Sequence, residues 1–470
     1  MAIKSICAFG SSAVVGLFAA SGLSAPGAQA VRPNVIYILA DDLGWAELGC
    51  YGNSFNETPN LDRLASQGMR FTQAYASAPV CSPYRAALMT GQLPARIGVT
   101  DYLRPDTDWH LPDDMVTLPE LFKEAGYVTG MAGKWHLSGY DQNGVKSGPG
   151  KHGFDEVMVS EQLGIANGSY FHPYRRVNPS LPAVLGAREY LTDRLNYEAV
   201  QFIQRHQSEP FFFYLSHYAV HTALAAKPEL VAHFRAKPGA TAPVSDPNRR
   251  KLGTPQGKKN NPVLAAMLKS VDDGVGMIMS ELESLGLSEN TLIVFTSDNG
   301  GEDWVTSNAP LRAGKSHVYE GGIREPLIVK WPGAVLPGSV CTTPTVNVDF
   351  YPSFAQILGV KEGSQTLDGV SIVPLLRGKR IADRPFFWHY PLEKKHFLGG
   401  RSSGAMRFGD WKLVEFFDDQ TLELYNLKNN VGEFVDLADQ YPEKVQQLSG
   451  MLKTWRRDVS ARFPEGQAAP

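Results

Sequence analysis

The amino-acid sequence predicts an α/β protein built on a large, mainly parallel sheet, because short apolar segments alternate with helical ones. Four continuously apolar segments are typical of strands buried on both faces: 34–40, 127–132, 210–216 and 291–297. Helical spacing of apolar residues is found between them, at 117–125, 197–206 and 262–285. This alternation favours a parallel sheet covered by helices.

The chain is expected to have one large domain and one small domain. Its 470 residues are too many for one simple core. Past about Pro385 the pattern changes, since 406–417 and 421–427 are typical of short strands and 442–455 of an amphipathic helix. We therefore expect a catalytic domain over 31–385 and an α+β domain with a short antiparallel sheet over 386–470. Residues 237–261, rich in Pro, Gly and basic residues, are predicted to form a long surface loop.

The N-terminus has the pattern of a targeting segment. Lys4 precedes an apolar stretch, Ile6 to Leu23, and Ala28-Gln29-Ala30 supplies the small residues of a cleavage site. Residues 1–30 are therefore predicted to be a signal peptide, and a membrane anchor is the alternative. Export to the periplasm or out of the cell follows, with no predicted membrane span after cleavage.

Composition and cysteine content limit the classes of function only slightly. The chain is 43% hydrophobic and 20% charged, with a net charge of -3, so no electrostatic feature predicts nucleic-acid binding. A local positive pocket for an anion is still compatible with that charge. Of the four cysteines, Cys7 would leave with the signal peptide. Three cysteines remain, so at least one of them has no disulfide partner. A disulfide between Cys50 and Cys341 is possible, but no spacing pattern supports it.

Acidic and amide side chains follow two of the predicted strands. Asp41 and Asp42 come directly after the first strand, and Asp298 and Asn299 follow the last. Ligands of open α/β sheets bind at the carboxyl ends of strands, and hard oxygen ligands select Ca²⁺ or Mg²⁺. Each pair alone has another interpretation, because Asp and Asn often cap helices or begin turns.

The segment Cys81-Ser82-Pro83-Tyr84-Arg85, followed by Thr90-Gly91, resembles the signature of the formylglycine-dependent sulfatases, Cys-x-Pro-x-Arg. Tyr84 stands where that family commonly has a small residue. Other segments of the family appear in order along nearly all of the mature chain: Asp41-Asp42, Gly133-Lys134-Trp135-His136, His221, Asp298-Asn299-Gly300-Gly301, Lys315, Tyr319 to Arg324, and Gly409 to Leu413.

The resemblance implies an alkaline-phosphatase-like sandwich and a chemistry that no single residue would predict. A maturation enzyme would oxidise Cys81 to formylglycine, whose hydrate attacks the sulfur and then expels sulfate. Calcium, with Mg²⁺ as the alternative, would be held by Asp41, Asp42, Asp298, Asn299 and the modified Cys81. The implied roles of the other residues are activation of the nucleophile by Arg85 and Lys134, sulfate binding by Lys134 and Lys315, a base at His136 and an acid at His221.

Several of these residues have ordinary structural interpretations when they are taken singly. A lone Lys is usually a solvated charge, and a lone His is usually a structural hydrogen-bonding group. We expect His217 to be structural and His221 to be catalytic. Trp304, Arg312 and His317 are candidates for a sugar subsite, although a structural role is the stronger expectation for each.

The predicted function is hydrolysis of sulfate esters on a sulfated polysaccharide or oligosaccharide. Exo-acting removal of sulfate from galactose or N-acetylgalactosamine is the more specific expectation. Alternatives are a phosphodiesterase or phosphonate monoester hydrolase of the same superfamily, a non-catalytic sugar-binding relative, and an enzyme that keeps Cys81 as a thiol.

Overall fold

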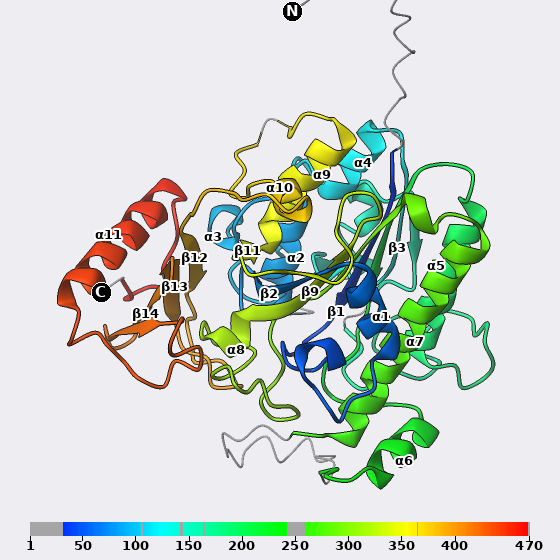
Figure 1. Ribbon diagram of the computed structural model, residues 1–470, viewed down its shortest axis with the longest axis horizontal. Helices are drawn as coiled ribbons and strands as arrows, with labels where there is room; N and C mark the ends of the chain where they lie inside the picture. The colour runs from blue at the N-terminus through cyan, green and yellow to red at the C-terminus, as the bar shows by residue number, and fades with distance from the viewer. Residues whose placement is uncertain are drawn as a thin grey trace, which may run out of the picture. The chain divides into compact units, whose positions relative to one another are not determined.

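The computed structural model describes residues 32–468, apart from 105–106, 142–143, 163–164, 242–258 and 364. The predicted signal peptide, residues 1–30, lies outside the described residues, as does most of the predicted loop at 237–261. The described chain is built around one large sheet, with a smaller sheet near the C-terminus (Figure 1).

The large sheet has nine strands and is mixed, but mainly parallel. The path runs β10-β2-β9-β8-β1-β7-β3-β6, and β11 pairs with β2. Strands β8, β1, β7, β3 and β6 are mutually parallel, and β9 runs antiparallel to β8 and β2. The bounds are β1 Asn34–Ala40, β2 Met69–Tyr75, β3 Val128–Gly133, β6 Glu156–Met158, β7 Phe211–Ser216, β8 Thr291–Ser297, β9 Arg324–Lys330, β10 Ser339–Cys341 and β11 Thr345–Val346.

Two layers of helix cover the two faces of this sheet (Figure 1). Alternate residues of β1 face opposite sides: Val35, Tyr37 and Leu39 join one apolar core, and Ile36, Ile38 and Ala40 join the other. Helices α2, α4 and α9 pack on the first face, and α1, α5 and α7 pack on the second. Burial on both faces explains why β1 is apolar without alternation.

The helical elements are α1 Pro59–Gln67, α2 Cys81–Thr90, α3 Pro94–Ile97, α4 Leu118–Glu124, α5 Leu191–Arg205, α6 Pro228–Ala236, α7 Pro262–Ser284, α8 Glu320–Ile323, α9 Phe350–Leu358, α10 Val373–Leu376 and α11 Pro442–Asp458, with 3-10 turns η1 Gly49–Tyr51, η2 Pro149–His152, η4 Ser288–Asn290 and η5 Asn347–Asp349. Strands β4 Tyr140–Asp141 and β5 Gly144–Val145 form a separate two-stranded sheet.

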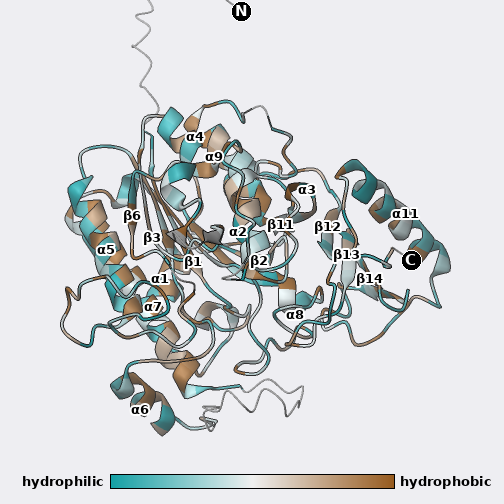
Figure 2. Cartoon of the chain, turned by 180° about the vertical axis from the view of Figure 1, so that it is seen from behind, coloured by the Kyte–Doolittle hydropathy of each residue, from teal (hydrophilic) through white to brown (hydrophobic). Residues whose placement is uncertain are grey.

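The C-terminal part is a four-stranded antiparallel sheet covered on one face by α11. Its strands are β12 Phe386–Tyr390, β13 Ser403–Phe408, β14 Trp411–Phe416 and β15 Leu422–Asn426. Met406, Leu413 and Leu424 pack against Leu448 and Leu452 of the helix. Figure 2 shows the alternation of apolar and polar residues along α11.

A buried charge network joins the small sheet to the part of the chain that holds the large sheet. The Lys412 ammonium of β14 lies 2.9 Å from Glu320 of α8 and 2.9 Å from Glu433, and all three side chains are fully buried. Tyr75 of β2 donates a hydrogen bond to Glu320 at 2.7 Å. Such a network holds the loops of the C-terminal part in a defined position beside the large sheet.

The predicted fold class is confirmed, and the element boundaries are close to those expected. The predicted strands at 34–40 and 291–297 coincide with β1 and β8, and the predicted helix at 262–285 coincides with α7 to within one residue. Helix α5 begins at Leu191, six residues before the predicted 197. The predicted strand at 406–417 is two strands, because Gly409 has a φ of +60° and turns the chain between β13 and β14. The proposed domain boundary at 385 stays a prediction.

The three cysteines of the described chain, Cys50, Cys81 and Cys341, are all free thiols, so the disulfide considered between Cys50 and Cys341 is not formed. None of the described helices combines the length and apolar character that a bilayer crossing needs.

Candidate active site

Four parallel strands end at one edge of the large sheet and deliver the polar residues predicted from sequence. The register pairs Leu39 of β1 with Ser216 of β7 and with Thr296 of β8, so these strands end level with one another. Gly133 of β3 pairs with Ser216 in turn. The residues that follow the strands are therefore neighbours: Asp41 and Asp42 after β1, Lys134 after β3, His217 after β7, and Asp298 and Asn299 after β8.

Three carboxylates and one thiol form a compact buried cluster at this edge. One ligand atom from each of Asp41, Asp42, Cys81 and Asp298 lies within 4.8 Å of the others, and all four side chains are buried. Asp42 has a φ of +61°, a conformation that Asp tolerates better than most residues. Its backbone N–H donates to Asp298 Oδ1 at 3.1 Å, which holds the two strand ends together.

Each carboxylate of the cluster has its own buried cation. The Lys134 ammonium lies 2.8 Å from Asp41, and the Lys315 ammonium lies 2.7 Å from Asp42. Arg85 donates two hydrogen bonds to Asp298 Oδ2, at 2.7 and 3.1 Å. All six side chains are buried, so each charge depends on its partner.

Cys81 is the first residue of helix α2, and its thiol donates to Asp41 Oδ1 over 3.6 Å. Every residue of α2 is buried, which holds this side chain against the cluster. Burial raises the pKa of the Cys81 thiol to about 12, even though Lys134 and Lys315 lower it. An unmodified thiol here would therefore be protonated at neutral pH and weak as a nucleophile.

The carboxylates differ in their protonation. Burial and the neighbouring carboxylates raise the pKa of Asp41 to about 7, although Lys134 opposes this shift. Burial also opposes ionisation of Asp42, but Lys315 and His221 outweigh it, so the pKa of Asp42 is lowered. Arg85 likewise outweighs burial and lowers the pKa of Asp298. Repulsion among three carboxylates is the condition that a bound cation relieves.

The donor set fits a hard divalent cation. The Asn299 amide donates to Asp42 at 2.8 Å, whereas its buried Oδ1 has no hydrogen-bond partner in the described part of the chain. An unpaired carbonyl oxygen beside three carboxylates is the oxygen-rich arrangement that Ca²⁺ and Mg²⁺ bind. Three carboxylates also face three cations, so a divalent ion would leave the site positive and suited to an anionic substrate.

Two of the predicted histidines border the cluster. His136 Nε2 donates to the Leu103 carbonyl at 2.8 Å, which leaves buried Nδ1 with a lone pair and no partner among the described residues. His221 Nε2 lies 3.6 Å from Asp42 Oδ2. Burial and then Lys134 lower the pKa of His136, and burial and then Lys315 lower the pKa of His221 to about 3. Both imidazoles are neutral in the free enzyme at neutral pH.

Glu161 contributes to the site although nothing in its sequence context indicated this. Its carboxylate accepts hydrogen bonds from the backbone N–H groups of Trp135 and His136, the first at 2.9 Å. Tyr218 donates to the same carboxylate at 3.0 Å. Glu161 thus holds the turn that carries Lys134 and His136, and only the tertiary structure brings it there.

His217 follows β7 and is fully buried, with no hydrogen-bond partner for either ring nitrogen within the described residues. Burial lowers its pKa to about 3, against about 6.5 for an unfolded chain. As the pH falls, His217 is therefore protonated in the unfolded chain before it is protonated in the folded protein. The stability that the protein has above pH 6.5 is lost as the pH falls below that value.

We expect His217 to make the protein acid-labile. Between pH 7 and 5 this residue alone should lower the free energy of unfolding by about 2 kcal/mol. His217→Leu should reduce that decrease in a series of thermal or urea unfolding curves, and His233→Leu is the control because the His233 side chain is 53% exposed. Equal pH dependence in wild type and His217→Leu would contradict the assignment.

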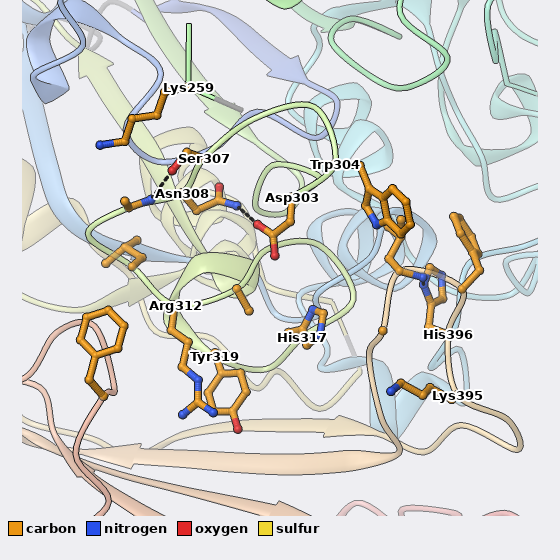
Figure 3. Close-up of a pocket in the computed structure, with 17 residues that line it drawn as sticks. Lys259, Asp303, Trp304, Ser307, Asn308, Arg312, His317, Tyr319, Lys395 and His396 are labelled. Atoms are coloured by element: carbon orange, nitrogen blue, oxygen red, sulfur yellow. Dashed lines mark hydrogen bonds between the residues drawn. The ribbon is translucent and has the colours of Figure 1, made fainter. Parts of the chain in front are cut away.

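The three candidate sugar-binding residues line one pocket, but they are not equivalent (Figure 3). Arg312 stacks on the Tyr319 ring at 3.8 Å and donates to Tyr425 and to the Glu433 carbonyl, so it connects the two parts of the protein. Trp304 and His317 line the same pocket. Sequence analysis did not include His396, Phe397 and Phe434, which come from the C-terminal part.

An α/β fold that brings a buried thiol, three carboxylates and three cations to the carboxyl edge of its sheet is suited to the hydrolysis of anionic esters. Residues 33–360 match the family described as Sulfatase, and residues 313–458 match N-sulphoglucosamine sulphohydrolase, C-terminal. The chain belongs to the sulfatase family and is a sulfuric ester hydrolase.

Relatives and solved structures agree with this family. N-acetylgalactosamine-6-sulfatase of Canis lupus familiaris is 36% identical over 408 residues, which cover 79% of this chain and 71% of that protein. A sulfatase of Formosa agariphila is 32% identical, and the match covers 90% of this chain and 88% of that protein. The crystal structure of Ps i-CgsB in complex with k-i-k-neocarrahexaose is 32% identical, with a TM-score of 0.77 and coverage of 92% and 94%.

Proposed function

We propose that this sulfatase removes sulfate from sulfated oligosaccharides or polysaccharides, with a nucleophile made from Cys81 by oxidation to formylglycine. The observation that supports this most strongly is the position of Cys81, buried at the start of α2 and 3.6 Å from Asp41. A residue at this point belongs to the carboxylate cluster, and the positive charges of Lys134 and Lys315 act on it.

The environment of Cys81 favours a hydroxyl nucleophile over a thiolate. With a pKa of about 12, the thiol would be almost wholly protonated at neutral pH. The hydrate of formylglycine would supply two hydroxyl groups at this position, one to attack and one to expel sulfate afterwards. Arg85 is held by the Lys134 carbonyl at 2.8 Å and by Ser216 Oγ at 2.6 Å, so its guanidinium has a fixed orientation behind the nucleophile.

The metal assignment is part of the proposal. Asp41, Asp42, Asp298 and Asn299 would hold Ca²⁺, with Mg²⁺ as the alternative, and the ion would stabilise negative charge next to position 81. Lys134 and Lys315 hold protons firmly because Asp41 and Asp42 outweigh burial and raise the pKa of each ammonium. Both ammonium groups therefore remain positive and can bind the sulfuryl oxygens.

The two histidines suit two different proton transfers. His136 has a free Nδ1 lone pair, so it can accept a proton from the residue at position 81. His221 Nε2 lies 3.6 Å from Asp42 Oδ2, and its pKa of about 3 reflects burial and Lys315. An anionic ester bound to Lys315 would offset that charge and raise the pKa of His221, which lets it protonate the leaving oxygen.

A sulfated carbohydrate is the substrate class that the relatives support. The relative from Canis lupus familiaris is named N-acetylgalactosamine-6-sulfatase, and the similar solved structure is a complex with k-i-k-neocarrahexaose. We therefore propose exo-acting removal of sulfate from galactose or N-acetylgalactosamine. Export after cleavage of residues 1–30, to the periplasm or the medium, would bring the enzyme to such substrates.

The test is a screen of defined sulfated mono- and oligosaccharides with protein whose Cys81 modification has been verified by peptide mass. Release of inorganic sulfate from a sulfated galactose or N-acetylgalactosamine is the expected result. Faster hydrolysis of an aryl phosphate diester than of any sulfate ester would favour the phosphodiesterase alternative. Binding of sulfated sugars without sulfate release, by fully modified protein, would favour the sugar-binding alternative.

A further inference from the structure

A buried tyrosine hydroxyl holds the turn that ends at His221. Tyr170 lies between β6 and α5, and its side chain is fully buried. Its hydroxyl lies 2.7 Å from the Tyr218 carbonyl oxygen and 2.8 Å from the His221 carbonyl oxygen, so one O–H donates to both ends of the turn 218–221. The His221 N–H closes the same turn by donating to the Tyr218 carbonyl at 3.1 Å. The backbone position of His221 therefore depends on a residue 51 positions earlier in the chain.

Tyr170 is itself fixed by the start of helix α5. Its backbone carbonyl accepts from the N–H of Leu191, the first residue of that helix, at 2.7 Å. Its ring centroid lies 6.2 Å from that of Tyr190, whose hydroxyl donates to the Ala225 carbonyl at 2.9 Å. Burial and then Asp41 raise the pKa of Tyr170, so its hydroxyl keeps its proton and remains a donor. The segment after β7 is thus attached to the start of α5 at two places.

The middle of the same turn is attached to the strand end that supplies the carboxylates. The Val220 N–H donates to the Asp41 carbonyl at 2.8 Å, and the Asp41 N–H donates to the Ala219 carbonyl at 2.9 Å. These bonds fix residues 219 and 220 beside β1, and the Tyr170 hydroxyl fixes the last residue of the turn, His221. The two sets of bonds together place His221 next to the cluster.

The orientation of the His221 ring follows from the backbone at 221–222. His221 Nδ1 donates to the Thr222 carbonyl, and the Thr222 hydroxyl donates to Glu302 at 2.6 Å. The Thr222 and Glu302 side chains are both buried. Because Nδ1 makes that bond, Nε2 is the nitrogen that faces the cluster, 3.6 Å from Asp42 Oδ2. A change in the backbone at this point would therefore rotate the imidazole away from the cluster.

We propose that Tyr170 is a positioning residue, whose hydroxyl holds His221 in the orientation from which Nε2 can protonate the leaving oxygen. In that step the sulfur–oxygen bond of the ester breaks, its electron pair remains on the leaving oxygen, and a proton moves from His221 Nε2 to that oxygen. Tyr170 acts through His221 and not by contact with the substrate. This inference rests on the proposed function and adds to it a residue to which no sequence motif pointed.

Leaving groups of different basicity test this role. A sugar alkoxide needs a proton as it departs, whereas 4-nitrophenolate is a stable anion and needs one much less. The probes are galactose 6-sulfate and N-acetylgalactosamine 6-sulfate as sugar esters and 4-nitrophenyl sulfate as the aryl ester. Tyr170→Phe removes only the hydroxyl. It should lower kcat for the sugar esters about tenfold more than kcat for the aryl ester, with little change in KM.

His221→Ala is the reference for this loss. It should show the same preference, with a loss on the sugar esters that exceeds the loss on the aryl ester by about 10²-fold or more. Tyr170→Phe in the His221→Ala background should cause no further loss, because a residue that acts through His221 has no effect once the imidazole is absent. A merely structural role for Tyr170 would instead lower both kinds of ester equally and add to the loss in His221→Ala.

Tyr51→Phe is the matched control. The Tyr51 hydroxyl is also buried and donates to two backbone carbonyls, that of Phe71 in β2 at 2.6 Å and that of Leu327 in β9 at 3.0 Å. This variant should keep the wild-type ratio of the sugar-ester rate to the aryl-ester rate. Thermal unfolding should show that all variants are folded.

The positioning role is overturned if Tyr170→Phe changes kcat for both kinds of ester by the same factor, or changes neither. It is also overturned if the effect of Tyr170→Phe persists in the His221→Ala background. An equal loss of both kinds of ester in His221→Ala would remove the acid role of His221, and with it the role of Tyr170. Continued release of sulfate from 4-nitrophenyl sulfate in these variants would leave the proposed nucleophile at Cys81 intact.

Discussion

Cys81→Ala is expected to lower kcat/KM for sulfate ester hydrolysis by at least about 10⁴-fold, because it removes the nucleophile and leaves only charge and binding to act. Stability should change little, since the side chain is small and the thiol makes only a 3.6 Å contact to Asp41. Release of inorganic sulfate, measured with the same substrate for both proteins, gives the ratio. Cys81→Ser should show a similar loss if the host cannot convert serine to formylglycine.

Cys341→Ala is the control for this loss. Cys341 is also a buried free thiol, but it lies in the edge strand β10, remote in the fold from the carboxylate cluster. It should retain activity near that of the wild type. Peptide mass should also show an aldehyde at position 81 in active protein. Full activity of protein with an unmodified Cys81 thiol would contradict the proposed nucleophile.

Asp298→Ala is expected to damage both stability and activity. It removes the partner of Arg85, whose guanidinium is buried and donates to Asp298 at 2.7 and 3.1 Å. An unpaired buried charge costs about 3–5 kcal/mol, so the unfolding transition should shift by several degrees. Activity should fall about 10³-fold or more, because a metal ligand is lost together with the fixed orientation of Arg85. Bound calcium, measured by mass spectrometry of the metal, should fall in parallel.

Asp418→Ala is the matched control for the ion pair. Asp418 also pairs with an arginine, Arg401, but both side chains are substantially exposed and Asp419 lies beside them. Removing an exposed pair should cost no more than about 1 kcal/mol, without effect on calcium or turnover. Retained calcium in Asp298→Ala would argue against the proposed ligand set, even if activity were lost.

The strands of the large sheet were predictable because their patterns are local. Residues 34–40 and 291–297 are apolar without interruption, which is what burial on both faces requires, and both strands were placed correctly. Strands β2 and β9 were not assigned, since their sequences mix polar and apolar residues and their pairing depends on neighbours far along the chain. The predicted start of helix α5 lies too far along the chain for a similar reason, because the first turn of the helix is buried by tertiary contacts.

The residues of the site could be named from the sequence, but their relations could not. Asp41, Asp42, Asp298 and Asn299 follow strands, and that position alone predicts a common edge of the sheet. The pairing of Lys315 with Asp42, across 273 residues, depends on how two loops meet in space. The same holds for Glu161, whose carboxylate holds the turn at Trp135 and His136.

The family, the fold class and the chemical types available at the strand ends were predictable from the sequence, because motifs and periodicity are properties of short segments. Three features depend on the tertiary structure: which cation neutralises which carboxylate, how strongly burial raises the pKa of Cys81, and the position of the loop that carries His396 and Phe397 at a wall of the pocket. Those features depend on distance and on exclusion of water, and both are set by packing between segments far apart in the chain.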